Sequence, residues 1–381
     1  MDFQLTDDQR AWQSKILALA ESELNAGLNE REAQSIFNFA GWRRCAEIGI
    51  HGLPIPREYG GQGADPVTTA LALESLGYGS HDNGLNFAIN AHMWTVEIPL
   101  LEFGTEAQRQ QWLPGLCSGQ WIGANAVSEP EAGSDVFSMQ MRAEKRDGHY
   151  VLNGHKTYIT SGPIADLFVV FAVTDPSRGK HGITAFLVEG HRPGLHVIRR
   201  IDKMGMNTAQ MGEIKFEDCE VPESHRLGKE GAGAMLFTHS MTWERSMILA
   251  PAVGAMRRIV ETCVKFARSR RQFGEPIGRF QLVASKIVDM KLRLETARQM
   301  LYSTAWHRSQ GSSVFMEAAL TKLHISESWV QTCLDAVQVH GAAGYLKDLT
   351  LERELRDSIG SRIYSGTSEI QKVIIASLLG L

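Results

Sequence analysis

Cysteine, long apolar runs and an excess of one charge are all scarce in this 381-residue sequence. Its five cysteines lie far apart, and none has a second ligand at zinc spacing. We therefore expect reduced thiols in a cytoplasmic protein, with neither disulfides nor a bound metal. The longest strongly apolar run, residues 167–173, is far shorter than the ~20 residues of a membrane helix, so no membrane insertion is expected.

The charge balance excludes a further class of partner. Lys and Arg total 39 against 43 Asp and Glu, a formal net charge of -4, so no global field favours nucleic acid or an anionic membrane. Any acidic ligand must be held by local groups. Residues 1–10 carry acidic side chains where a secretory signal would have basic residues and an apolar core, so export is not expected.

Several catalytic and nucleotide-binding motifs are missing from the sequence. It contains no GxxxxGK[ST], HExxH, GxSxG or EF-hand loop. Gly231-Ala232-Gly233 lacks the third glycine of a dinucleotide fingerprint and does not follow a strand, which argues against a Rossmann dehydrogenase. The 13 histidines are dispersed and are interpreted as surface or core residues rather than metal ligands.

The hydrophobic pattern that is present begins with a helical unit, residues 1–120. T-x-x-Q capping boxes at Thr6 and Thr105 predict two helix starts, and turn residues at 59–63 and 77–82 predict breaks. Short β-rich runs between turn signals then fill a second unit, residues 121–230. Within it, Asn153-Gly154 predicts a hairpin, because both residues tolerate positive φ.

Helical periodicity returns in a third unit, residues 231–381. Helical patterns fill residues 281–309 and 314–340, and an apolar face precedes them at Val253, Met256, Val260, Cys263 and Ala267. The order helical, β, helical favours the α+β class, with an antiparallel β module between two helical units.

Residues 127–135, with the sequence VSEPEAGSD, form a polar loop at the start of the β module. Backbone N–H groups and hydroxyls in such a loop are able to hold a pyrophosphate, and an ordinary polar connection is the alternative. The loop resembles the flavin-binding signature of the acyl-CoA dehydrogenase family, and four further family signatures follow in the family's order. They are NGHKTYIT at 153–160, RRQFG at 270–274, QVHGAAG at 338–344 and IYSGTSEIQ at 363–371.

The resemblance spans the whole chain and implies the family's fold: an N-terminal helical domain, an antiparallel β-barrel or sandwich domain and a C-terminal four-helix bundle. It also implies FAD between the β module and the C-terminal helices of a homotetramer. By match, the flavin or its phosphates would be contacted by Asn125, Val127, Ser128, Gly133 and Ser134, with Tyr158 and Thr160 against the isoalloxazine. The neighbouring subunit would supply Arg270, Gln272, Phe273, Gln281, Gln338 and Gly341, while Thr367 and Glu369 would close the site.

Two of these residues have simpler interpretations when taken alone. Arg270 offers paired donors and a permanent charge, which suit a pyrophosphate, but a solvated surface charge is the alternative. Phe273 could equally belong to the core.

The family's reaction takes a proton from the α-carbon of an acyl thioester while a hydride leaves the β-carbon, so a carboxylate base is required. Many members place this glutamate directly after the tyrosine of a Tyr-x-Gly-Thr loop, where this chain has Ser365 after Tyr364. Isovaleryl-type members place it at the position matched by Glu244. Helical spacing puts Glu244 in an apolar stripe, where burial would raise its pKa; a carboxylate neutralised by a buried basic partner is the alternative.

Arg245, Tyr364 and Ser365 are expected to contact the substrate, the last through a backbone N–H that would stabilise the thioester carbonyl. Two departures from the family pattern indicate an altered thioester arm. Thr242 stands where aspartate is common, and residues 204–209 lack the family's arginine and serine. Drift in an ordinary CoA enzyme would look the same.

Within the family, the chain is most similar to the prolyl-carrier-protein dehydrogenases of pyrrole and anatoxin-type biosynthesis. These oxidise L-proline held as a thioester on a phosphopantetheinyl carrier protein, giving a pyrroline or pyrrole thioester. One alternative is an isovaleryl-like or short branched-chain acyl-CoA dehydrogenase, and another is a catalytically silent flavin-fold binding subunit. A partner flavoprotein and oxygen both remain open as the electron acceptor.

Overall fold

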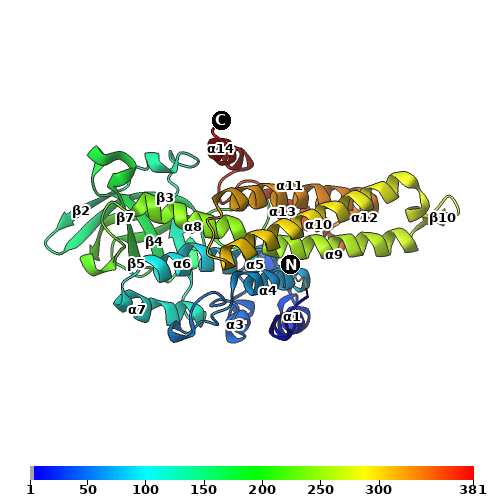
Figure 1. Cartoon of the computed structure of the whole chain (residues 1–381), viewed down its shortest axis with the longest axis horizontal. Coiled ribbons are helices and arrows are strands. Elements are labelled where there is room, and N and C mark those ends of the chain that lie inside the picture. The colour runs from blue at the N-terminus through cyan, green and yellow to red at the C-terminus, as the bar shows by residue number, and fades with distance from the viewer. Residues whose placement is uncertain (1–3) are drawn as a thin grey trace.

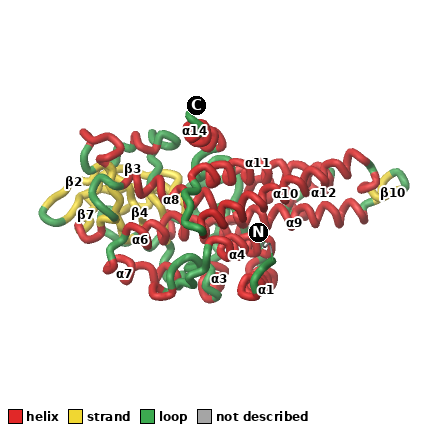
Figure 2. Tube along the Cα trace, in the orientation of Figure 1, coloured by secondary structure: helices red, strands yellow, loops and turns green. Residues whose placement is uncertain are grey.

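A computed structural model describes residues 4–381, so residues 1–3 of the expected first unit lie outside the described residues. The chain forms a helical layer, a β unit and a long helical bundle (Figure 1). The strands of the large sheet gather at one end of the molecule, and the bundle extends to the opposite end (Figure 2). The predicted order helical, β, helical is confirmed.

The N-terminal helices begin where the sequence predicts. Thr6 and Thr105 accept from the backbone N–H groups of Gln9 and Gln108, whose side chains complete both capping boxes. The break expected at 77–82 starts later, because a helix continues to Gly79. The helices are α1 Asp7–Leu19, α2 Leu28–Gln34, α3 Phe39–Glu47, α4 Pro66–Gly79, α5 Asn83–His92, α6 Ile98–Phe103 and α7 Glu106–Cys117, with π-helical segments Ala20–Leu24 and Met93–Glu97.

The β unit is an eight-stranded sheet in the order β6-β7-β3-β2-β4-β5-β8, with β1 paired to β4. Most pairs are antiparallel as predicted, but β1 and β2 both pair with β4 in parallel. The strands are β1 Gly123–Ala126, β2 Arg142–Arg146, β3 His149–Thr160, β4 Leu167–Val173, β5 Ile183–Glu189, β6 Leu195–Arg200, β7 Met211–Pro222 and β8 Arg226–Leu227. Alternate residues of β4 pack in the main core and inside the β unit, which explains its unbroken apolar run.

The hairpin predicted at Asn153-Gly154 is wrong. Both residues lie inside β3, which pairs with β7 on either side of a register shift between Leu152 and Gly154. The Asn153 side chain donates to Asp218 on β7 at 3.1 Å and accepts from its backbone N–H at 2.8 Å. A β-bulge held by this distant partner therefore replaces the chain reversal. The chain reverses instead at residues 147–148, Asp-Gly, where both φ angles are positive.

The C-terminal helices agree with the predicted helical stretches. They are α8 Gly233–Met247, α9 Ala250–Ser269, α10 Gln281–Ser309, α11 Phe315–His340, α12 Ala342–Tyr345, α13 Leu351–Gly360 and α14 Ser368–Leu378. The predicted apolar face of α9 is buried, and α8 to α11 pack together as the expected bundle. A short hairpin, β9 Arg271–Gln272 and β10 Glu275–Pro276, joins α9 to α10 at the far end (Figure 1). No helix within residues 4–381 combines the length and apolar character needed to cross a membrane.

Helix α4 of the N-terminal layer packs closely against α9 of the bundle. A Cβ atom on Gly254 would lie 2.0 Å from the carbonyl oxygen of Glu74, and one on Gly77 would lie 1.9 Å from that of Pro251. Backbones this close leave no room for a side chain. The two glycines therefore set the distance between the layer and the bundle.

Gly254→Ala is expected to destabilise the protein by about 2 kcal/mol or more, because the added methyl group must separate two helix backbones. Urea unfolding followed by circular dichroism measures the effect. Gly360→Ala, at the end of α13, is the matched control, since its Cβ would make an ordinary 3.7 Å contact with Tyr364. We expect the control to be neutral or slightly stabilising, and equal losses in both variants would contradict the role given to Gly254.

Candidate active site

Glu244 lies on α8, in the bundle, and only 6% of the residue is exposed. Its neighbours at helical spacing, Met241, Met247 and Ile248, are buried as the apolar stripe predicts. The carboxylate is therefore enclosed by apolar side chains on its own helix. A charge in such surroundings needs specific polar contacts.

One such contact comes from Ser365, whose hydroxyl donates to Oε1 of Glu244 at 2.7 Å. Burial is the main cause of a raised Glu244 pKa, and the Ser365 hydrogen bond and the positive charges of Arg245 and Lys322 act against it. The carboxylate is thus a stronger base than a solvent-exposed glutamate, and it accepts a hydrogen bond from the Ser365 hydroxyl.

The turn that carries Ser365 follows α13 and has an unusual backbone. Ser365 and Gly366 both have positive φ, +58° and +85°. The Ser365 carbonyl accepts from Arg245 Nε at 3.2 Å and Gln371 Nε2 at 3.1 Å. Lys322 Nζ and Gln371 Nε2 both donate to the Gly366 carbonyl at 2.8 Å. Since a non-glycine residue rarely adopts positive φ unless its surroundings enforce it, these donors hold Ser365 against the base.

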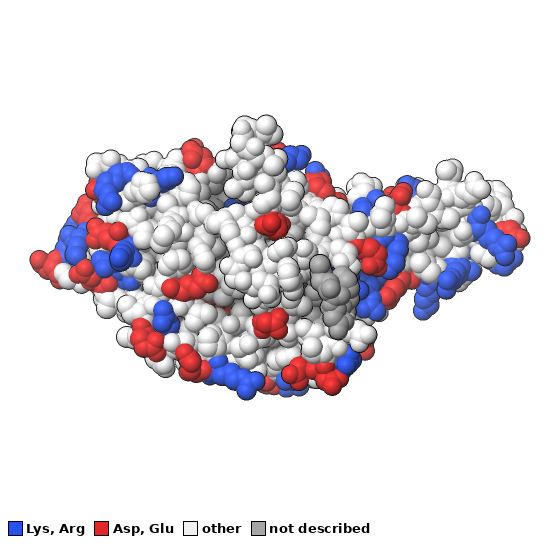
Figure 3. Space-filling view, viewed as in Figure 1, with Lys and Arg blue, Asp and Glu red and all other residues white. Residues whose placement is uncertain are grey.

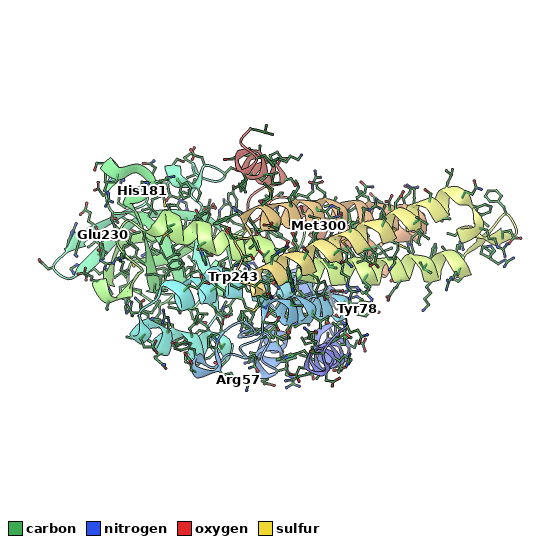
Figure 4. All side chains as sticks on the ribbon, viewed as in Figure 1. Arg57, Tyr78, His181, Glu230, Trp243 and Met300 are labelled. Atoms are coloured by element: carbon green, nitrogen blue, oxygen red, sulfur yellow. The ribbon has the colours of Figure 1, made fainter. Side chains whose placement is uncertain are left out.

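Aromatic side chains from several elements pack against α8 and against the turn after α13. The Trp243 ring stacks on Trp94, with centroids 5.9 Å apart and planes 5° apart, and the Arg308 guanidinium lies 3.9 Å from the Trp243 centroid. Figure 4 shows Trp243 near the middle of the molecule, on α8. Tyr364 packs on Phe87 with centroids 4.4 Å apart. The sequence predicted no role for Phe87, Trp94 or Arg308, because no local motif contains them.

A buried ion pair anchors the 127–135 loop. Lys156 on β3 is fully buried, and its Nζ donates to the Val127 carbonyl at 2.8 Å and to Glu129 Oε1 at 2.9 Å. The Glu129 carboxylate also accepts backbone N–H groups from Gln140 and Met141. Burial lowers the pKa of Lys156 to about 8 although the charge of Glu129 opposes this. Both residues belong to motifs noted above, but their separation in sequence hid the pair.

The face of the β unit beside this loop presents open polar groups and an aromatic ring. Asn125 Oδ1 on β1 is buried without a hydrogen-bond partner in residues 4–381. Tyr158 on β3 is 63% exposed at a positive φ of +58°. Ser128 and Thr160 are half-buried, whereas Gly133 and Ser134 are exposed. A buried acceptor without a donor and an exposed ring fit a bound polar, planar group.

A second set of predicted residues lies at the opposite end of the molecule. Arg270, Gln272 and Phe273 are exposed at the β9–β10 end of the bundle, as are Gln281, Gln338 and Gly341 near it (Figure 1). Within one chain these residues do not meet Glu244 or the β unit. The core interpretation of Phe273 is wrong, because the residue is 94% exposed.

The last two predicted residues stand at the start of α14. Thr367 caps this helix by accepting the Ile370 N–H through Oγ1 at 3.2 Å, and Glu369 is exposed in its first turn. A cap at this point fixes the direction in which the chain leaves the Ser365 turn.

Fold and site together indicate an enzyme of the α+β class, with a buried carboxylate of raised pKa in its bundle and an open polar face on its β unit. Family models match the chain in order: the acyl-CoA dehydrogenase N-terminal domain at residues 6–120, the middle domain at 124–219 and the C-terminal domain at 231–380. The chain therefore belongs to the acyl-CoA dehydrogenase family, and the resemblance seen in the sequence is confirmed.

Comparison with individual proteins shows which members of the family this chain resembles. The chain is 44% identical, over all of both chains, to an L-prolyl-[peptidyl-carrier protein] dehydrogenase from Pseudomonas fluorescens. Its structure matches that of the prolyl acyl carrier protein oxidase AnaB with a TM-score of 0.98 and 52% identity, covering 99% of this chain and 100% of AnaB. It matches PigA, solved with FAD and proline, with a TM-score of 0.97 and 42% identity over all of both chains.

Lys156→Met is expected to loosen the 127–135 loop, because Glu129 would keep a buried charge without its cation, a loss that typically costs ~3–5 kcal/mol. Hydrogen–deuterium exchange read by mass spectrometry should show amides of residues 127–141 exchanging at least ~10-fold faster. Lys145→Met, which removes an exposed lysine paired with Glu223 on the same β unit, is the control. Unchanged exchange in Lys156→Met would show that the pair does not anchor the loop.

Proposed function

We propose that this protein is an FAD-dependent dehydrogenase that oxidises an L-prolyl thioester on a phosphopantetheinyl carrier protein to a pyrroline- or pyrrole-type thioester. The observation that carries the proposal is the buried carboxylate of Glu244, held by Ser365 at 2.7 Å, in a chain of the acyl-CoA dehydrogenase family. Full-length similarity to prolyl-carrier dehydrogenases and to AnaB supports the substrate class.

Glu244 is the catalytic base in this proposal. Its carboxylate takes the proton from the α-carbon of the thioester, and the raised pKa suits that task. The Ser365 hydroxyl orients the carboxylate, while the Ser365 backbone N–H binds the thioester carbonyl, on which negative charge develops. Arg245 fixes the same turn through the Ser365 carbonyl, and the Tyr364 ring walls the substrate site.

FAD supplies, when bound, the acceptor for the hydride that leaves the neighbouring carbon. The open face of the β unit fits this cofactor: Asn125 offers an unpartnered acceptor, and Tyr158 offers an exposed ring. Backbone and side-chain donors for the phosphates and ribityl chain would come from Val127, Ser128, Gly133, Ser134 and Thr160. Thr367 and Glu369 would close the site. PigA, a relative of the same fold, was solved with FAD and proline.

The remaining flavin contacts belong to a second subunit in this proposal. Arg270, Gln272, Phe273, Gln281, Gln338 and Gly341 lie at the far end of the bundle, where Lys and Arg side chains also gather (Figure 3). Leu282, Val288 and Leu292 on α10 are 85%, 65% and 61% exposed, an apolar surface that favours association. A homotetramer in which each far end completes a neighbour's site accounts for both features.

Three positions of the thioester-arm site depart from the family pattern: Thr242, Asn207 and Ala209. The Thr242 hydroxyl donates to the Thr238 carbonyl of its own helix at 2.9 Å. Asn207 and Ala209 stand where the family has arginine and serine; Asn207 Oδ1 is buried without a hydrogen-bond partner in residues 4–381, and Ala209 is 2% exposed. The site thus lacks the aspartate, arginine and serine that are common in the family. CoA and a carrier share the pantetheine arm, so the choice of the carrier rests on the similarity to prolyl-carrier dehydrogenases.

Glu244→Gln is expected to keep the fold, FAD and subunit assembly but to lose turnover by at least ~100-fold, the low end of what a general base contributes. Steady-state assays and the visible flavin spectrum measure both properties. Glu261→Gln is the control and should keep full activity, because Glu261 is an exposed carboxylate on α9 that pairs with Arg257. Near-normal turnover in Glu244→Gln would rule out this base.

The substrate is tested by mass spectrometry after mixing the enzyme with prolyl-loaded carrier protein and, separately, with isovaleryl-CoA. We expect a loss of about two or four mass units, one hydrogen pair per two-electron step, on the carrier alone. Oxidation of isovaleryl-CoA alone would identify an isovaleryl-like dehydrogenase. Freshly purified protein without FAD, inert towards both thioesters, would identify a silent binding subunit.

A further inference from the structure

Lys322 on α11 is a buried lysine that lies outside the five signatures quoted above. The residue is 0% exposed, and its Nζ donates to the carbonyl oxygen of Gly366 at 2.8 Å. It forms no ion pair with a carboxylate within residues 4–381. Burying an ammonium group beside a carbonyl alone is costly, so a position that retains one needs a physical reason.

The Gly366 carbonyl alone does not provide that reason. Gln371 Nε2 already donates to the same oxygen at 2.8 Å and to the Ser365 carbonyl at 3.1 Å. A neutral donor therefore holds the turn without any cost of burying charge. What Lys322 adds to this neutral bond is a positive charge.

That charge is joined to the base through the Ser365–Gly366 turn. Gly366 directly follows Ser365, whose hydroxyl contacts Glu244 at 2.7 Å, so one short turn links the ammonium group to the carboxylate. Burial lowers the pKa of Lys322 to about 8, and the charge of Glu244 acts in the opposite direction. Reciprocally, Lys322 lowers the pKa of Glu244 against the effect of burial.

Other polar and charged groups of residues 4–381 also face the two side chains. Glu244 is faced by Arg245 from α8 itself and by Tyr364 and Ser365 from the turn. The charge of Arg245 lowers the pKa of Lys322, and the charges of Glu327 and Glu369 raise it. Arg245 supplies a second positive charge that acts on Glu244, whereas the carboxylates of Glu327 and Glu369 act on Lys322.

We propose that Lys322 is a positioning residue for the reaction: its buried positive charge, held at the Gly366 carbonyl, keeps Glu244 ionised so that the base is ready for substrate. The role rests on the proposed function of Glu244 as the base. Lys322 acts through the turn and through its charge, and it does not itself take the substrate proton.

Two substitutions separate the charge from the hydrogen bond. Lys322→Gln keeps an N–H donor for Gly366 without the charge, and Lys322→Met removes both. In each, Glu244 loses a neighbouring cation, so its pKa rises and the acidic limb of the kcat/KM profile should move up by ~1 pH unit. On that limb, kcat/KM falls about tenfold, while activity at the plateau changes little in Lys322→Gln.

A substrate-free readout keeps this test separate from the proposed function. The infrared band of a protonated carboxyl that disappears in Glu244→Gln reports the titration of Glu244 directly in the FAD-loaded protein. Its midpoint should rise in Lys322→Gln and Lys322→Met and stay unchanged in Lys291→Met, which removes an exposed lysine of α10.

An unchanged midpoint in both Lys322 variants would overturn the proposal, whatever thioester the enzyme oxidises. If the acidic limb of the kcat/KM profile shifts in Lys322→Met but not in Lys322→Gln, the hydrogen bond rather than the charge is responsible. That result would also overturn the proposal. Failure of both variants to fold would show a purely structural lysine. A shifted midpoint in an enzyme that ignores prolyl carrier protein would support Lys322 while rejecting the proposed substrate.

Discussion

The hydrogen bond from Ser365 to Glu244 is the interaction on which the site depends. It joins α8 to the turn after α13, two elements 121 positions apart in sequence. Glu244 brings a buried carboxylate, and the turn brings two residues with positive φ. Neither arrangement is favourable alone, since a buried charge needs a donor and a strained turn needs external hydrogen bonds. Arg245 and Gln371 provide those bonds at the Ser365 carbonyl.

The rest of the fold holds these elements in place. Gly77 and Gly254 allow the N-terminal layer to approach the bundle, and Trp94 from that layer stacks on Trp243 beside the base. On the β unit, the buried pair of Lys156 and Glu129 ties the loop proposed to bind FAD to β3. The base and the proposed cofactor face are therefore supported by different elements.

Local patterns in the sequence predicted what local physics determines. The capping boxes at Thr6 and Thr105, the apolar face of α9 and the burial of Glu244 all follow from helical spacing, and the structure confirms them. Asn153-Gly154 was mistaken for a turn because its partner, Asp218, lies 65 positions away. No local pattern predicts the contact of Lys322 for the same reason, since its acceptor, Gly366, is 44 positions further along the chain.

Anaerobic rapid mixing of the FAD-loaded enzyme with prolyl-loaded carrier protein tests the central claim most directly. One carrier sample bears ordinary L-proline and the other bears proline with deuterium at the α-carbon. If Glu244 removes the α-proton while the flavin is reduced, the flavin bleaches with both samples and more slowly with the deuterated one. A flavin that stays yellow with both samples would contradict the proposed reaction.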